Sequence, residues 1–133
     1  MISVGNSPGR GRGVFSDKTF QAGDLIEQAP VLVLPDPQWL SLDTTELRDY
    51  HYAWGENAAA IVLGYGSLYN HSYTPNAMYV RNMDARLMEY VALCDIAVGE
   101  EITVNYNGDP EDMTPQWFET PGNRSEQPLN LNS

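Results

Sequence analysis

Apolar residues recur in short runs along the chain, and most of these runs are typical of β-strands. Residues 25–34 (LIEQAPVLVL) are rich in Val, Leu and Ile, and Pro35-Asp36-Pro37 should end that strand, because proline cannot donate to a sheet ladder. Further strands are predicted at 14–15, 50–54, 58–63, 76–80, 87–94 and 102–106. The runs at 76–80 and 87–94 are expected to pair as a hairpin.

One segment, residues 39–50, has the period of a helix. Several apolar side chains fall on roughly one face of a 3.6-residue turn, and Ser41 or Asp43 can cap the start. The sequence therefore predicts a mostly β fold with one short helix near 41–50.

The apolar pattern fades after residue 106. Trp117 and Phe118 are the last large apolar residues that could dock on the body of the protein. Beyond Thr120 the chain (PGNRSEQPLNLNS) has little to bury, so we expect residues 120–133 to be a disordered tail. The remaining residues, 1–119, are long enough for one domain with a single core.

The composition makes the protein strongly acidic. Seven Lys and Arg face 18 Asp and Glu, giving a formal net charge of −11. Such a chain repels phosphates and anionic headgroups, which disfavours binding to nucleic acid or membrane surfaces. A basic partner would be attracted, although the same charge could serve only to keep a small protein soluble.

Cysteine and histidine are scarce. Cys94 is the single cysteine, which excludes an internal disulfide, and with only His51 and His71 a four-ligand zinc site is not expected. The start of the chain has no apolar signal-peptide core, and no run approaches the roughly 18 apolar residues of a membrane helix. We expect a soluble, intracellular protein.

Three polar or glycine-rich segments are candidates for chemistry. They are 9–13 (GRGRG), 64–76 (GYGSLYNHSYTPN) and 99–106 (GEEITVNY). Glycines let a backbone approach a ligand, but a glycine-rich lead-in is also an ordinary turn. Taken singly, the second segment could be a structural turn around a satisfied histidine, and the third a strand with an aromatic end.

The order and spacing of the three segments change their interpretation. Gly-x-Gly-Val-Phe, then Asn-His-Ser-x-x-Pro-Asn, then Gly-Glu-Glu-Ile-x-x-x-Tyr about 30 residues later resemble the SET-domain protein lysine methyltransferases over roughly residues 5–108. The resemblance implies a β-clip SET fold of several small sheets with a C-terminal pseudoknot. It also implies a stand-alone SET domain over 1–119, in which 109–119 form a Trp-containing C-terminal segment.

The resemblance further implies specific roles. Tyr106 would be the catalytic tyrosine, and Tyr79 would limit the number of methyl groups added. Tyr52 and Tyr69, with Tyr79, are candidate walls of the substrate lysine channel, although each could equally be a core aromatic. The residues expected to bind S-adenosylmethionine, which leaves as S-adenosylhomocysteine, are Gly11, Arg12, Gly13, Asn70, His71, Tyr106 and Trp117.

The chain departs from many family members at its end. Residues 107–133 contain no cysteine, so the zinc-binding post-SET segment is missing and no metal is expected. Trp117 could stack on the adenine instead, or simply anchor a surface helix. The expected function is methyl transfer to a lysine of a histone or another basic protein. The alternative is an inactive SET-fold module that binds basic peptides.

Overall fold

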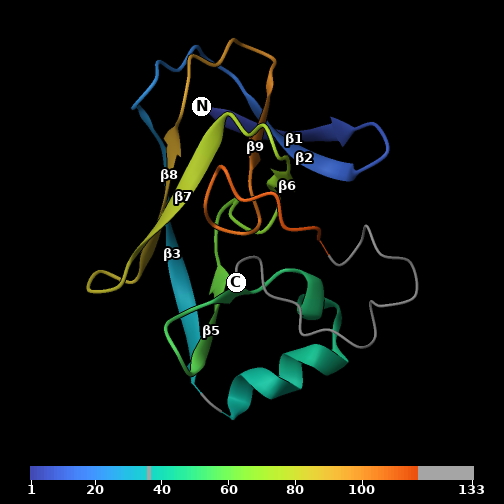
Figure 1. Cartoon of the computed structure of the whole chain (residues 1–133), viewed down its shortest axis with the longest axis vertical. Helices are drawn as coiled ribbons and strands as arrows, with labels where there is room; N and C mark the ends of the chain where they lie inside the picture. Colours follow the sequence, from blue (N-terminus) through green and yellow to red (C-terminus); the bar gives the residue numbers. More distant parts are fainter. Residues whose placement is uncertain (36, 117–133) are drawn as a thin grey trace.

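The computed structural model describes residues 1–35 and 37–116, and these form two small β-sheets (Figure 1). The four-stranded sheet has the order β1 (Ile2–Ser7), β2 (Gly11–Ser16), β9 (Glu101–Val104), β6 (Asn70–His71). The five-stranded sheet has the order β4 (Tyr52–Ala53), β5 (Ala58–Val62), β3 (Leu25–Pro35), β8 (Leu87–Ala92), β7 (Ala77–Asn82). The predicted mostly β fold is confirmed.

The long strand β3 joins the two halves of the five-stranded sheet. Residues 25–30 pair with β8, and residues 31–35 pair with β5. Pro30 lies at the changeover, where a residue without an N–H is tolerated because the ladder is interrupted there. The predicted strand is confirmed, and it ends at Pro35 as expected.

The predicted hairpin is also confirmed. Strands β7 and β8 are antiparallel from Ala77↔Ala92 to Asn82↔Leu87. The Asn82 side chain accepts the N–H of Ala85 at 3.1 Å and so closes the turn between the strands.

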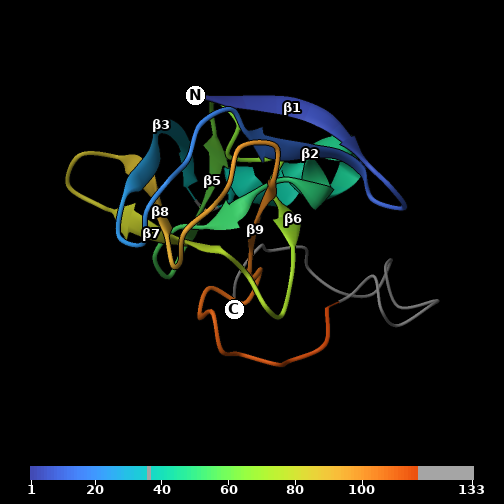
Figure 2. The same ribbon diagram turned by 90° about the horizontal axis from the view of Figure 1, so that it is seen from above.

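Two strands were not predicted because neither carries a strong apolar pattern. β1 has the sequence ISVGNS and is held by a six-residue antiparallel pairing with β2. β6 has only two residues, which pair in parallel with β9 at Asn70↔Thr103 and His71↔Val104. This parallel pair joins the second and third motifs, the contact expected of the pseudoknot. Seen from above, the segment after β9 passes close to the loop after β6 (Figure 2).

The helix predicted near 41–50 differs from expectation. It consists of two 3₁₀ helices, η1 (Gln38–Thr44) and η2 (Glu46–Asp49). Thr45 lies between them with φ −128° and ψ 170°, an extended conformation that interrupts the helical run. Its hydroxyl accepts a backbone N–H of η2 at 3.2 Å, so Thr45 caps the second helix in place of the two predicted upstream caps.

The core between the sheets is rich in tyrosine. Tyr52, Tyr69 and Tyr90 are at most 1% exposed. The Tyr69 and Tyr90 rings stack with centroids 4.3 Å apart, and Tyr52 meets Tyr79 edge-on at 5.1 Å. Desolvation raises the pKa of all four phenols above the ordinary value, so each stays neutral in the folded protein.

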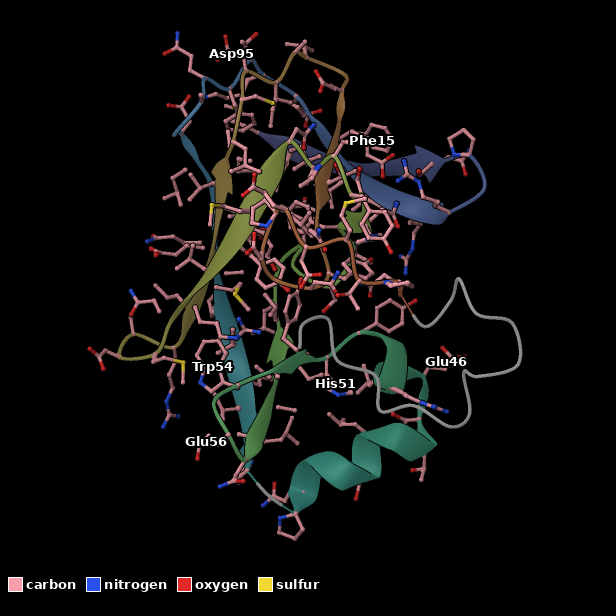
Figure 3. The ribbon with its side chains drawn as sticks, in the orientation of Figure 1. Phe15, Glu46, His51, Trp54, Glu56 and Asp95 are labelled. Carbon is pink, nitrogen blue, oxygen red and sulfur yellow. The ribbon has the colours of Figure 1, made fainter. Side chains whose placement is uncertain are left out.

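Several charged residues lie at the surface, although Glu27 contacts this core through the Tyr69 hydroxyl and Arg81 lies over the Tyr79 ring. Figure 3 shows Glu46, Glu56 and Asp95 at separate points of the periphery, whereas His51 and Trp54 lie inward beside β4 and β5. These three carboxylates therefore lie at separate parts of the surface. Within residues 1–35 and 37–116, no helix is long and apolar enough to cross a membrane.

Candidate functional site

A pocket of about 390 Å³ opens where the β1–β2 hairpin, the end of η2 and the segment before β6 converge. Its volume is in the range of pockets that bind small molecules and cofactors. Four residues predicted to bind the cofactor are present in its wall. The lining residues are Arg10, Gly11, Arg12, Tyr50, Ser67, Leu68, Asn70 and Tyr106.

The hairpin side of the pocket is cationic. Arg10 Nη2 donates to Glu101 Oε1 at 2.7 Å, and Arg10 Nη1 donates to the His71 carbonyl at 3.3 Å. The Arg10 side chain is 44% exposed, so this ion pair adds little stability but fixes the direction of the guanidinium. Arg12 lines the same pocket. Two of the seven basic residues of an acidic chain therefore gather at one ligand-sized cavity.

Asn70 ties the hairpin to the strand beside it. Its Nδ2 donates to the Arg12 carbonyl at 3.0 Å and to Glu101 Oε2 at 2.8 Å. Both N–H groups of the amide are thereby used. The side-chain oxygen of Asn70 takes no part in these two contacts and can face a ligand.

Gly13 packs behind the pocket rather than in its wall. A Cβ at this position would meet Asn70 Nδ2 at 2.9 Å and would also strike the Glu101 carboxylate. Only glycine allows this close approach of β2 to the polar groups of β6 and β9. Gly13 is therefore required for close packing of the strands, whereas Gly11 and Arg12 line the cavity.

Glu101 is the polar centre of this region, and sequence analysis did not single it out as a site residue. Its side chain is 14% exposed and also accepts the Ser7 hydroxyl at 2.8 Å. Asn76, the last residue of the Asn-His-Ser-x-x-Pro-Asn motif, donates to the Glu101 carbonyl at 2.8 Å and accepts the Thr103 N–H at 2.9 Å. The second motif therefore fixes the strand that leads to Tyr106.

His71 is not part of the pocket wall but holds Tyr106. Its Nδ1 accepts the Tyr106 N–H at 3.0 Å, and the two ring centroids are 5.2 Å apart. With Nδ1 as an acceptor, the proton of the neutral ring lies on Nε2. The structure thus brings His71 to the site as a support for Tyr106, not as a lining residue.

Tyr106 presents its hydroxyl at the pocket. The hydroxyl donates to the Tyr69 carbonyl at 2.7 Å, and this contact fixes the direction of its O–H bond. Desolvation raises the pKa of Tyr106, so the phenol stays neutral at physiological pH. A neutral oxygen fixed in this way can orient a cationic or amine-bearing ligand.

The three aromatic candidates for the lysine channel lie in the core behind Tyr106. Tyr79 is 4% exposed, and its hydroxyl donates to the Tyr106 carbonyl at 3.1 Å. The hydroxyls of Tyr52 and Tyr69 donate to the Gly66 carbonyl and to Glu27 at 2.7 and 2.8 Å. None of the three lines the 390 Å³ pocket, so their channel role stays a prediction.

The pocket includes four residues that the motifs did not indicate. Arg10, Ser67 and Leu68 lie inside the candidate segments 9–13 and 64–76, although the sequence analysis gave none of the three a role. Tyr50 comes from the end of η2, and no local pattern marks it. The fold alone brings it to the cavity.

The described end of the chain folds back towards the second motif. Asn105 Nδ2 donates to the Asp112 carbonyl at 2.7 Å, and the Tyr73 hydroxyl donates to the Thr114 carbonyl at 3.1 Å. Gln116 is buried and donates to Asn107 Oδ1 at 2.8 Å. Trp117, predicted to contact the cofactor, and the predicted tail 120–133 lie outside the described residues.

Comparison with known proteins agrees with this geometry. The model of the SET domain family matches residues 11–107. The chain is 30% identical over 119 residues to a Schizosaccharomyces pombe histone-lysine N-methyltransferase specific for H3 lysine 37, covering 89% of this chain and 77% of that protein.

Solved structures give the same relationship. A crystal structure of a candidate histone methyltransferase from Plasmodium falciparum superposes with a TM-score of 0.65 at 30% identity, covering 82% of this chain and 99% of that one. Polycomb Repressive Complex 2 of Chaetomium thermophilum, a humanized mutant bound to an inhibitor, gives a TM-score of 0.66 at 17% identity. That match covers 80% of this chain and 15% of the other and shows a shared fold.

Proposed function

The chain belongs to the SET-domain family, and we propose that it is a protein-lysine N-methyltransferase that uses S-adenosylmethionine. The family match covers residues 11–107, and we take 1–119 as the single SET unit. The observation that carries the proposal is the meeting of all three motifs at one pocket, where Gly11, Asn70 and Tyr106 line the same wall.

The pocket fits S-adenosylmethionine in size and in charge. Its volume of about 390 Å³ suits a ligand of that size. The methionine part of the ligand carries a carboxylate, and the guanidinium groups of Arg10 and Arg12 are suitable partners for it. Asn70 is held with its N–H groups turned into the protein, so its oxygen is available to the ligand ammonium group.

When bound, S-adenosylmethionine supplies a methyl carbon attached to a positively charged sulfur. A lysine can accept this methyl group only as a neutral amine, because the protonated ammonium has no lone pair. The free amine has a pKa of about 10.4, and desolvation near a second positive charge lowers it. In this proposal the rings of Tyr79, which is buried, and Tyr106, which is partly buried, would supply such an environment.

The chain contributes positioning rather than acid–base chemistry. His71 binds the backbone N–H of Tyr106, and the Tyr69 carbonyl accepts its hydroxyl. The position of the phenol oxygen and the direction of its O–H bond are therefore fixed. Desolvation keeps this phenol neutral by raising its pKa, so it is a poor general base. Holding reactants in the attacking geometry can by itself account for several kcal/mol, about 7 or more in favourable cases.

The proposed substrate is a lysine-bearing basic protein, with histones as the first candidates. The net charge of −11 attracts basic segments over long range. The Schizosaccharomyces pombe relative is named for a lysine of histone H3, and the same substrate class would place this protein in the nucleus.

The test is a product assay with recombinant core histones and S-adenosylmethionine, read by mass spectrometry. We expect histone peptides that gain the mass of one or more methyl groups on lysine, with Tyr106→Phe as the depleted control. S-adenosylhomocysteine binding without any methylated product would instead favour the inactive peptide-binding module. Absence of both binding and product would contradict the proposal.

A further inference from the structure

Glu27, a carboxylate outside the three motifs, contacts the segment whose Tyr69 carbonyl accepts the Tyr106 hydroxyl. Glu27 lies on β3, paired with Tyr90 of β8, directly after the register shift between Leu25 and Glu27. Such irregularities turn a side chain away from the direction that a regular ladder would give it. Glu27 is half-buried and points towards the segment that precedes β6.

Glu27 holds that segment at both of its ends. Its Oε2 accepts the backbone N–H of Tyr65 at 3.0 Å, and its Oε1 accepts the Tyr69 hydroxyl at 2.8 Å. The chain closes tightly over the carboxylate at Gly64, which has φ +63° and where an added Cβ would strike Glu27 Oε2. Glu27 thus binds both ends of residues 64–69, which we call the Glu27 loop, while the hydroxyls of Tyr52 and Tyr90 bind its middle at the Gly66 carbonyl.

The Glu27 loop contributes both to the pocket wall and to the position of Tyr106. Ser67 and Leu68 line the pocket, and the Tyr69 carbonyl accepts the Tyr106 hydroxyl at 2.7 Å. Tyr69 therefore contacts Glu27 through its side chain and Tyr106 through its backbone. A displacement of Tyr69 would move the acceptor that gives the Tyr106 hydroxyl its direction.

We propose that Glu27 is a positioning residue for methyl transfer, because it holds the Glu27 loop so that the Tyr69 carbonyl aims the Tyr106 hydroxyl. The inference rests on the proposed function. It adds a residue of the β3–β8 pair, remote in sequence from every motif, to the groups on which the reaction depends.

The substitution Glu27→Gln tests this with almost no change of shape. The glutamine oxygen can keep only one of the two donors, so the Tyr69 hydroxyl loses its carboxylate acceptor and must either turn to accept from the NH₂ group or lose the contact. Glu89→Gln is the matched control, because Glu89 lies on the adjacent strand, accepts a hydrogen bond from Gln28 at 2.7 Å and does not touch the loop. Folding of both variants is checked by circular dichroism.

The primary measurement is the methylation rate of recombinant core histones as S-adenosylmethionine is varied. For Glu27→Gln we expect kcat to fall about tenfold, the effect of about 1.4 kcal/mol in the transition state, while KM for S-adenosylmethionine stays within about threefold. For Glu89→Gln both values stay near wild type. A kcat for Glu27→Gln within about twofold of wild type would overturn the proposal.

A double-mutant cycle separates positioning from general stability. In the Tyr106→Phe background there is no hydroxyl to aim, so adding Glu27→Gln should cause no further loss of kcat. A merely structural role would multiply the two losses, and that result also overturns the proposal. Tyr69→Phe removes the same contact from the other side and replaces Glu27→Gln in the cycle if the latter does not fold.

Hydrogen exchange measured by mass spectrometry gives a readout that needs no substrate. Glu27→Gln should speed amide exchange in residues 64–71 and leave the β7–β8 hairpin unchanged, with no change at either place in Glu89→Gln. Failure of the wild type to methylate histones would count against the proposed substrate. Unchanged exchange in residues 64–71 would count against the role of Glu27 itself.

Discussion

Tyr106 lies between two regions that are held together in different ways. On one side, the polar region consists of Asn70, Asn76 and Glu101, whose side chains bridge β2, β6 and β9 through hydrogen bonds of 2.8–3.0 Å. On the other side, the aromatic region consists of Tyr52, Tyr69, Tyr79 and Tyr90. These side chains are buried, their rings stack or meet edge-on, and most of their contact area is apolar. Tyr106 uses both, because its N–H is bound by His71 and its hydroxyl by the Tyr69 carbonyl.

The difference predicts where substitutions should act. A polar bridge depends on direction, so losing one shifts the groups that face the ligand. Ring packing depends on area and volume, so losing the hydroxyl of Tyr52 or Tyr90 should cost stability more than function, whereas the Tyr69 hydroxyl also binds Glu27. The predictions below set changes in one region against changes in the other.

The largest effect is expected from alkaline pH, because ionisation of the buried tyrosines should unfold the protein. Burial raises the pKa of five of the eight tyrosines above their ordinary value of about 10. A raised native pKa stabilises the fold below the unfolded value, and this stabilisation is lost as the pH rises past it. Phenolate absorbance at 295 nm should therefore appear together with loss of circular dichroism. Titration of most phenols near pH 10 in a still-folded protein would contradict the described burial.

The next largest effect is expected at the junction of the two regions. Tyr106→Phe removes the hydroxyl and keeps the ring, so kcat should fall about 100-fold through loss of positioning. Affinity for S-adenosylhomocysteine should stay within about threefold, because the polar region is intact. Steady-state kinetics with calorimetry measures both. An unchanged kcat would remove Tyr106 from the mechanism.

A smaller effect is expected when the polar region is crowded. In Gly13→Ala the new Cβ displaces Asn70 Nδ2 and the Glu101 carboxylate, so affinity for S-adenosylmethionine should fall about tenfold. Gly23→Ala is the control, since Gly23 has φ +91° but nothing within 4 Å of the added atom. The control should lose about 1 kcal/mol of stability and keep its affinity. Equal affinities for the two variants would show that crowding of Asn70 does not reach the ligand.

The smallest effect is expected from the single hydroxyls of Tyr52 and Tyr90 in the aromatic region. The Gly66 carbonyl accepts from Tyr52 at 2.7 Å and from Tyr90 at 3.2 Å, so either donor can satisfy it alone. Tyr52→Phe and Tyr90→Phe should each cost about 1 kcal/mol in the free energy of unfolding, and kcat should change less than about threefold. The double variant leaves this carbonyl without both donors and should cost more than the sum. Strict additivity in chemical denaturation would show that the two hydroxyls act independently.

The sequence predicted the elements whose pattern is local. β3 is marked by its run of Val and Leu and by Pro35, and the β7–β8 hairpin by two apolar runs around Asn82. β1 could not be found in this way, because ISVGNS owes its conformation to pairing with β2. The break at Thr45 was also not predicted, since a 3.6-residue period in the apolar positions does not reveal one extended residue.

The same distinction applies to the site. Asn70, His71 and Tyr106 could be predicted because they lie in motifs with a specific spacing, and the structure brings all three together. Tyr50 and Glu27 could not, because only tertiary contacts bring the end of η2 to the pocket and β3 to the Glu27 loop. Composition likewise does not separate a channel tyrosine from a core tyrosine, and Tyr52 and Tyr69 lie in the core.

The most direct test of the central claim is calorimetric titration of the protein with S-adenosylmethionine and S-adenosylhomocysteine. Asn70→Ala is compared with Asn57→Ala, a change at an exposed position that does not line the pocket. We predict micromolar binding, about −8 kcal/mol, to the wild type and to Asn57→Ala, and its loss in Asn70→Ala. Absence of binding to the wild type up to about 1 mM, or about −4 kcal/mol, would contradict the assignment of this pocket to the methyl donor.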